Sequence, residues 1–148
     1  MFHPSFTKDP MLLNCGVIIE KDDKILLQRN PGETHWQIPG GMMQHDEKYE
    51  EAAIRGVMEE TNLTIEKMQF YGMLSGRDCL VTNKFGDKAV ILQVMFFTTK
   101  FSGKVKILDH SCREHRFFKR NNLPKNLNPQ HKSFISDWKA EKPFPIIK

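Results

Sequence analysis

The alternation of hydrophobic and polar residues predicts a β-hairpin near the start of the chain. Residues 12–20 are apolar and rich in β-branched types, and a polar turn at 21–24 separates them from the apolar run Ile25-Leu26-Leu27. Two such runs joined by a short polar turn are typical of a hairpin. Similar patterns predict further strands at 65–74, 88–99, 105–108 and 116–118, a turn at 83–87 and a short extended stretch at 36–38.

Helical spacing replaces this pattern over residues 47–61 and again over residues 130–139. Apolar residues recur there at helical intervals, which predicts one buried stripe on each helix. The stripe residues are Ala53, Ile54, Val57 and Met58 in the first helix, and Phe134, Ile135 and Trp138 in the second. Strands outnumber helices and do not alternate with them regularly. We therefore expect one domain over residues 1–148, of the α/β class in its α+β form, with a mixed β-sheet packed by helices.

Composition and the hydrophobic pattern indicate in which cellular compartment the protein is found. No apolar run approaches the roughly 20 residues that cross a bilayer, and the first residues lack the pattern of a secretion signal. We expect a cytoplasmic protein with no membrane partner. The cysteines Cys15, Cys79 and Cys112 are an odd number without paired spacing, which is typical of reduced thiols.

Charge is distributed unevenly along the chain. Residues 1–99 carry 10 Lys or Arg and 14 Asp or Glu, whereas residues 100–148 carry 12 and 4. Acidic clusters attract metal ions and basic ones attract phosphates. The basic part has neither the motif of an RNA-binding sheet nor zinc-finger spacing, so nucleic acid is not the expected partner.

One arc of the first predicted helix combines two carboxylates with two small residues. At about 100° per residue, Ala52, Gly56, Glu59 and Glu60 fall together. Magnesium prefers a few carboxylate oxygens, several waters and substrate phosphates, so this arc is a candidate metal site. The alternative is a solvated charged face, with Arg55 in i,i+4 ion pairs with Glu51 and Glu59.

The segment GMMQHDEKYEEAAIRGVMEETNL, residues 41–63, closely resembles the Nudix box, G-x5-E-x7-R-E-U-x-E-E-x-G-U, where U is aliphatic. Seven of its nine fixed positions match: Gly41, Glu47, Arg55, Val57, Glu59, Glu60 and Leu63. The resemblance continues more loosely through Arg29 and residues 36–40 before the box, and through residues 116–118 and 123–124 after it.

This resemblance implies the Nudix fold, a mixed β-sheet sandwiched between α-helices, with a loop–helix–loop unit that binds Mg²⁺ or Mn²⁺. Members of the family hydrolyse a pyrophosphate linkage in a nucleoside diphosphate joined to another group. Glu59 and Glu60 match the metal-binding pair. Glu47 and Arg55 complete the catalytic set by orienting that pair, and Gly40, Gly41 and Arg29 are the expected substrate-binding residues.

Two positions depart from the box. Asn62 replaces a glycine, a mild change because Asn tolerates the left-handed conformation. Gly56 replaces a glutamate that helps bind metal or position the catalytic water. The leading hypothesis is therefore a metal-dependent pyrophosphohydrolase with reduced activity, and the alternative is a catalytically inactive nucleotide-binding protein. Since Gly within a helix costs about 1 kcal/mol relative to Ala, propensity predicts that Gly56→Ala stabilises the helix; Gly56→Glu is expected to raise hydrolysis.

Several assignments stay open at this level. A later carboxylate, Asp109 or Glu114, is expected to complete the metal site, and His110 and His115 lie nearby in the sequence. Stacking on a base is one role for Trp36, Phe85 or Phe101, and core packing is another. The sequence decides neither the nucleotide substrate nor whether the chain forms a homodimer.

Overall fold

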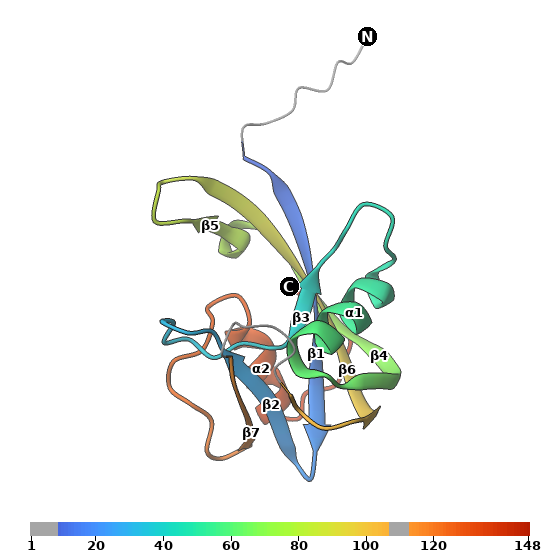
Figure 1. Cartoon of the computed structure of the whole chain (residues 1–148). Coiled ribbons are helices and arrows are strands. Elements are labelled where there is room, and N and C mark those ends of the chain that lie inside the picture. The colour runs from blue at the N-terminus through green and yellow to red at the C-terminus, as the bar shows by residue number, and fades with distance from the viewer. Residues whose placement is uncertain (1–8, 107–112) are drawn as a thin grey trace.

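The structure is a computed structural model that describes residues 9–106 and 113–148. A mixed sheet is covered by two helices (Figure 1). The strands are β1 (Met11–Lys21), β2 (Lys24–Arg29), β3 (Gly40–Met42), β4 (Thr64–Leu74), β5 (Leu80–Thr82), β6 (Lys88–Ser102), β7 (Glu114–Lys119) and β8 (Ile146–Ile147), and the helices are α1 (Tyr49–Thr61), α2 (Lys132–Lys139) and the 3₁₀ turn η1 (Arg77–Cys79).

β1 is the central strand of the sheet. The strand order is β7-β2-β1-β6-β4-β8, with β3 paired to β1 and β5 paired to β6. β1 runs antiparallel to β2 and β3 but parallel to β6. The expected hairpin and the mixed α+β sheet are therefore confirmed.

The two helices cover opposite faces of the sheet. Alternate residues of β1 point to opposite sides, and they belong to separate hydrophobic cores. Val17 packs in the core that contains Ala53 and Val57 of α1, whereas Ile18 packs in the core that contains Phe134 of α2. The sheet is thus sandwiched between helices, as expected.

Some local predictions were wrong. The buried face of α1 consists of Ala52, Ala53, Gly56, Val57 and Thr61. Ile54 is exposed and Met58 is half-buried, because α1 rests on the main chain of β3, where only small side chains fit. The expected strand at 105–108 is absent at Val105 and Lys106, and its other two residues lie outside the described part. Strand β8 was not predicted.

The described helices and cysteines bear on the expectations drawn from composition. Among the described residues, neither helix combines the length and hydropathy that crossing a bilayer requires. Cys15 and Cys79 are buried free thiols, while Cys112 lies outside the described residues.

Candidate functional site

Three glycines bring α1 and β3 into direct main-chain contact. A Cβ atom on Gly56 would lie 2.3 Å from the carbonyl carbon of Gly40 and 2.3 Å from the nitrogen of Gly41. A Cβ atom on Gly41 would lie 2.9 Å from the Cα of Gly56. Real Cβ atoms do not approach other atoms so closely, so the helix reaches this depth only because neither position carries a side chain.

This contact overturns two expectations about the helix. Ala52 and Gly56 do not line the candidate metal site beside the carboxylates, because both are buried against the sheet. Gly56→Ala also does not gain the stability that helix propensity predicts, since the added methyl group would overlap the backbone of Gly40. A glutamate at position 56 fits only if α1 moves away from β3.

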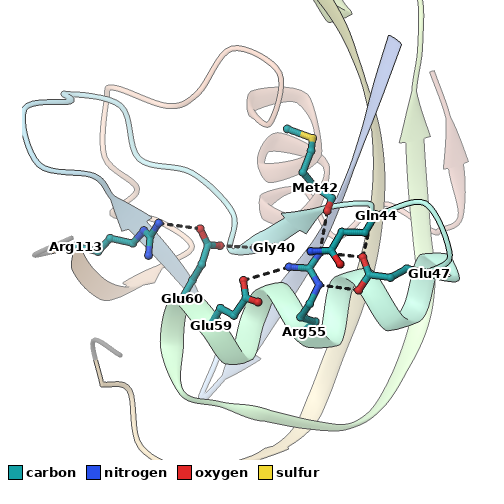
Figure 2. Close-up of polar contacts among 8 residues, drawn as sticks. All are labelled: Gly40, Met42, Gln44, Glu47, Arg55, Glu59, Glu60 and Arg113. Carbon is teal, nitrogen blue, oxygen red and sulfur yellow. Dashed lines mark hydrogen bonds and ion pairs between the residues drawn. The ribbon is translucent and has the colours of Figure 1, made fainter. Parts of the chain in front are cut away.

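Arg55 ties α1 to the loop that precedes it. Its Nε and Nη2 atoms donate to Glu47 at 2.6 and 2.9 Å, Nη1 donates to Glu59 at 3.1 Å, and Nη2 also donates to the carbonyl of Met42 at 2.8 Å (Figure 2). The hydrogen bonds from Arg55 hold the pKa of Glu47 below its ordinary value. Glu51, the other expected i,i+4 partner, instead accepts the backbone N–H of Lys48 at the start of the helix.

The two box carboxylates at the end of α1 have different surroundings. The side chain of Glu59 is 61% exposed, whereas that of Glu60 is 18% exposed. Glu60 accepts the backbone N–H of Gly40 at 2.9 Å and lies 3.6 Å from the guanidinium of Arg113 (Figure 2). Burial raises the pKa of Glu60, against the opposing effects of the Gly40 N–H and the Arg113 charge. Arg113 was not singled out from the sequence.

The residues around Glu60 offer oxygen ligands for a single cation. Gln28 is fully buried beside it and lies close enough to favour the ionised carboxylate, yet neither polar atom of its amide completes a hydrogen bond. Mg²⁺ takes one or two protein carboxylates and draws its other ligands from water and substrate phosphates. Glu59 and Glu60 fit that requirement, although the described residues contain no cluster of three acidic, His or Cys side chains.

Arg29 and Glu114 lie together on neighbouring strands. Arg29 of β2 donates to Glu114 of β7 at 2.5 Å, and Arg116 donates to the same carboxylate at 3.1 Å. Hydrogen bonding to Arg29 lowers the pKa of Glu114. The guanidinium of Arg29 also lies 4.7 Å from the ring centroid of Trp36. Arg29 and Glu114 therefore neutralise each other's charge in an ion pair.

The other candidates lie in the hydrophobic cores, in a turn or on β7. Trp36 is buried edge-on against Phe118, Phe85 is exposed in the turn between β5 and β6, and Phe101 packs beside the α1 core. His115 lies opposite Gln28 in the β2–β7 pair. Asp109 and His110 lie outside the described residues.

A polar cavity of about 280 Å³ lies beside Gly40, Gly41 and Glu60. Its lining includes Asn14, Gln93, Gln130 and His131, none of which was identified from the sequence. A signal for Gln93 did exist, because it is the single polar residue within the apolar run 89–97 of β6. Asn14 and His131 had no such signal, since each becomes important only through residues distant in sequence.

Comparison with known proteins relates this chain to the NUDIX domain family. The NUDIX domain family model matches residues 12–138. An ADP-ribose pyrophosphatase from Methanocaldococcus jannaschii is 34% identical over 124 residues, which cover 82% of this chain and 69% of that protein.

Solved structures agree with the fold. A MutT protein from Methanosarcina mazei has a TM-score of 0.72 at 19% identity and covers 92% of this chain and 98% of that one. A MutT NUDIX hydrolase from Burkholderia pseudomallei has a TM-score of 0.69 at 23% identity, covering 86% and 98%.

Proposed function

The chain belongs to the NUDIX domain family, and on that premise we propose that it hydrolyses the diphosphate bond of a nucleoside diphosphate linked to a further group. We further propose that Glu59 and Glu60 hold the divalent ion, Mg²⁺ or Mn²⁺, that this reaction uses. Hydrolysis is the activity of the family, and a diphosphate substrate agrees with the name of the M. jannaschii relative.

The contact between Glu60 and Gly40 is the observation that carries the proposal. The hydrogen bond to the Gly40 N–H fixes the Glu60 carboxylate at the edge of a polar cavity, with Glu59 next to it on the helix. A bound divalent ion would neutralise phosphate charge and lower the pKa of a bound water. Glu59 and Glu60 would determine where such an ion is held.

Glu47 and Arg55 act as positioning residues in this proposal. Arg55 contacts Glu47, Glu59 and the Met42 carbonyl at the same time, so it fixes the side chain of Glu59 relative to the loop. Arg113, paired with Glu60, places a second fixed positive charge at this end of the site. That charge favours a phosphate group in the space beyond the carboxylates.

Gly56 favours a second candidate function, a nucleotide-binding protein without turnover. The box glutamate is missing, and the contact of Gly56 with Gly40 and Gly41 leaves no room for a side chain. One carboxylate fewer reduces the negative charge available to a metal ion.

Turnover separates the two candidates. The purified chain is incubated with ADP-ribose, nucleoside diphosphate sugars, dinucleoside polyphosphates and nucleoside triphosphates, in Mg²⁺, Mn²⁺ or EDTA. The hydrolase proposal predicts cleavage of at least one diphosphate in the presence of metal and none in EDTA. Saturable binding without cleavage in either metal would favour the binding protein.

A further inference from the structure

The cavity beside Gly40 is lined by both polar and apolar residues. Ile38, Met42 and Ile91 supply the apolar surface, while amide side chains and His131 supply the polar groups. Among the described residues that line it, Glu60 alone carries a formal charge. A neutral, flat group with hydrogen-bonding edges therefore suits this cavity better than a phosphate does.

Hydrogen bonds fix the direction in which three amides of this cavity point. Gln130 Nε2 donates to the backbone carbonyl of Asp78 at 3.2 Å, and that carbonyl can only accept. Gln130 Oε1 must then accept from Gln93 Nε2 at 2.8 Å, and Gln93 Oε1 must accept from Asn14 Nδ2 at 2.9 Å. The chain of amides leaves Asn14 Oδ1 as an acceptor.

A second set of hydrogen bonds leaves donors in the same cavity. Asn128 Oδ1 accepts the backbone N–H of Gln130 at 2.9 Å, so Asn128 Nδ2 faces Gln37 Oε1 at 3.3 Å and leaves Gln37 Nε2 as a donor. His131 Nδ1 accepts the backbone N–H of Ile38 at 3.0 Å. Burial lowers the pKa of His131 to about 4, so the ring is neutral near pH 7 and Nε2 carries its proton.

We propose that this cavity is the subsite for the base of the substrate, and that it selects bases with a ring carbonyl beside a ring N–H, namely uracil, thymine and guanine, over adenine and cytosine. The carbonyl accepts from the donors of Gln37 and His131, and the ring N–H donates to Asn14 Oδ1. This inference rests on the proposed function and goes beyond it by naming the class of nucleotide.

The direction of the amide chain supplies the selectivity. Adenine and cytosine present an amine and an unprotonated ring nitrogen where the favoured bases present a carbonyl and an N–H. Their amine would face the donors of Gln37 and His131, which cannot turn because the Asn128 side chain and the Ile38 N–H hold them. Their unprotonated ring nitrogen would face Asn14 Oδ1, which the amide chain through Gln93 and Gln130 holds as an acceptor. A buried donor left without an acceptor is costly, so the mismatched bases bind more weakly.

Binding of UMP, GMP, AMP and CMP to the full chain, by calorimetry in Mg²⁺, tests the inference without requiring turnover. We expect UMP and GMP to bind at least about fivefold more tightly than AMP and CMP. Equal affinities for the four mononucleotides would overturn the inference. Binding of none of them would overturn it as well.

Two variants connect the selectivity to the amide chain. Asn14→Leu removes the Oδ1 acceptor at similar volume, so the preference for UMP and GMP over AMP and CMP should fall, while Asn121→Leu, the same change at an exposed position, should keep the ratio. Gln93→Met breaks the amide chain at similar volume and should bring the four affinities together, and it serves as the test if Asn14→Leu fails to fold. An unchanged ratio in the folded Asn14 and Gln93 variants would overturn the inference.

Hydrolysis of UDP-, GDP-, ADP- and CDP-glucose separates this inference from the proposed function. Cleavage at equal rates would overturn the base selectivity and leave the hydrolase intact. Failure to cleave any diphosphate, together with selective mononucleotide binding, would overturn the hydrolase and retain the subsite.

Discussion

At the scale of single residues, Gly56 determines how closely α1 approaches β3. A Cβ atom at this position would lie 2.3 Å from the backbone of Gly40 and Gly41. We predict that Gly56→Ala lowers the free energy of unfolding by about 1–3 kcal/mol, the usual cost of overpacking, as measured by urea denaturation. Contrary to what the box pattern predicts, Gly56→Glu should destabilise at least as much and should not raise turnover, because the added side chain would displace α1 from β3. A Gly56→Ala variant as stable as the original chain would show that α1 shifts at little cost.

His131 should make stability depend on pH. The unfolded histidine binds a proton near pH 6.5, whereas in the folded chain its pKa is lowered to about 4 by burial. Between these values the unfolded state binds more protons, so stability falls as pH drops from 6.5 to 4, by up to roughly 3 kcal/mol, and this contribution levels off below pH 4.

Denaturation of His131→Asn at several pH values provides the comparison. Asn can still accept the N–H of Ile38 but does not titrate, so its stability should vary less between pH 6.5 and 4. Parallel profiles for the two proteins would mean that His131 is not held neutral.

Residue-level predictions from the sequence succeeded where the contact is local. Arg55 pairs with Glu47 and Glu59, as expected, because helical spacing and a short loop bring these residues together. The partners of Glu60 were missed, since Gly40 and Arg113 approach it only after the sheet has formed. Sequence spacing carries no information on such distant pairs.

At the scale of elements, Arg55 joins the loop after β3 to α1. We predict that Arg55→Ala lowers the melting temperature and reduces Mn²⁺ affinity by roughly 10–100-fold, because Glu59 and the loop lose their common partner. Arg55→Lys should have a melting temperature and a Mn²⁺ affinity between those of the original chain and of Arg55→Ala, since it keeps the charge without the several directed N–H groups. Thermal melting and calorimetry measure both effects. Normal melting and metal affinity with complete loss of turnover would instead point to direct contact with the substrate.

The elements themselves were predictable to different degrees. α1 and the β1–β2 hairpin have strong periodicity, and both were predicted within a few residues. β8 has only two residues and is defined by its pairing with Gly72 and Met73 of β4, so no local sequence pattern predicts it. The buried face of α1 was misjudged at Ile54, because a helix that packs against glycines buries alanines rather than its larger apolar residues.

At the scale of the whole molecule, Arg120 links three parts of the fold. Its guanidinium donates to Glu20 of β1 at 2.8 Å and to Asp23 in the hairpin turn at 2.7 Å, and it lies 4.0 Å from the ring centroid of Trp138 in α2. It also donates to the Trp138 carbonyl. Arg120 thereby holds α2 against the sheet.

We predict that Arg120→Ala lowers the free energy of unfolding by about 2 kcal/mol, through the loss of the stacked ring contact and of the charge beside Glu20. Chemical denaturation measures this change. Arg120→Lys should lose less, because it keeps the charge but not the planar group. Full stability of the alanine variant would show that α2 is held by its apolar face alone.

Glu59 and Glu60 are proposed to bind the divalent ion, and titration with Mn²⁺ by calorimetry tests this proposal because the measurement works with or without turnover. The original chain and the variant with Glu59→Gln and Glu60→Gln are titrated under the same conditions, after thermal melting has shown that both are folded. We predict that the variant binds Mn²⁺ at least about tenfold more weakly, since removing both carboxylates leaves no charged ligand of this pair. Equal Mn²⁺ affinity in the two proteins would place the metal site elsewhere and contradict the account.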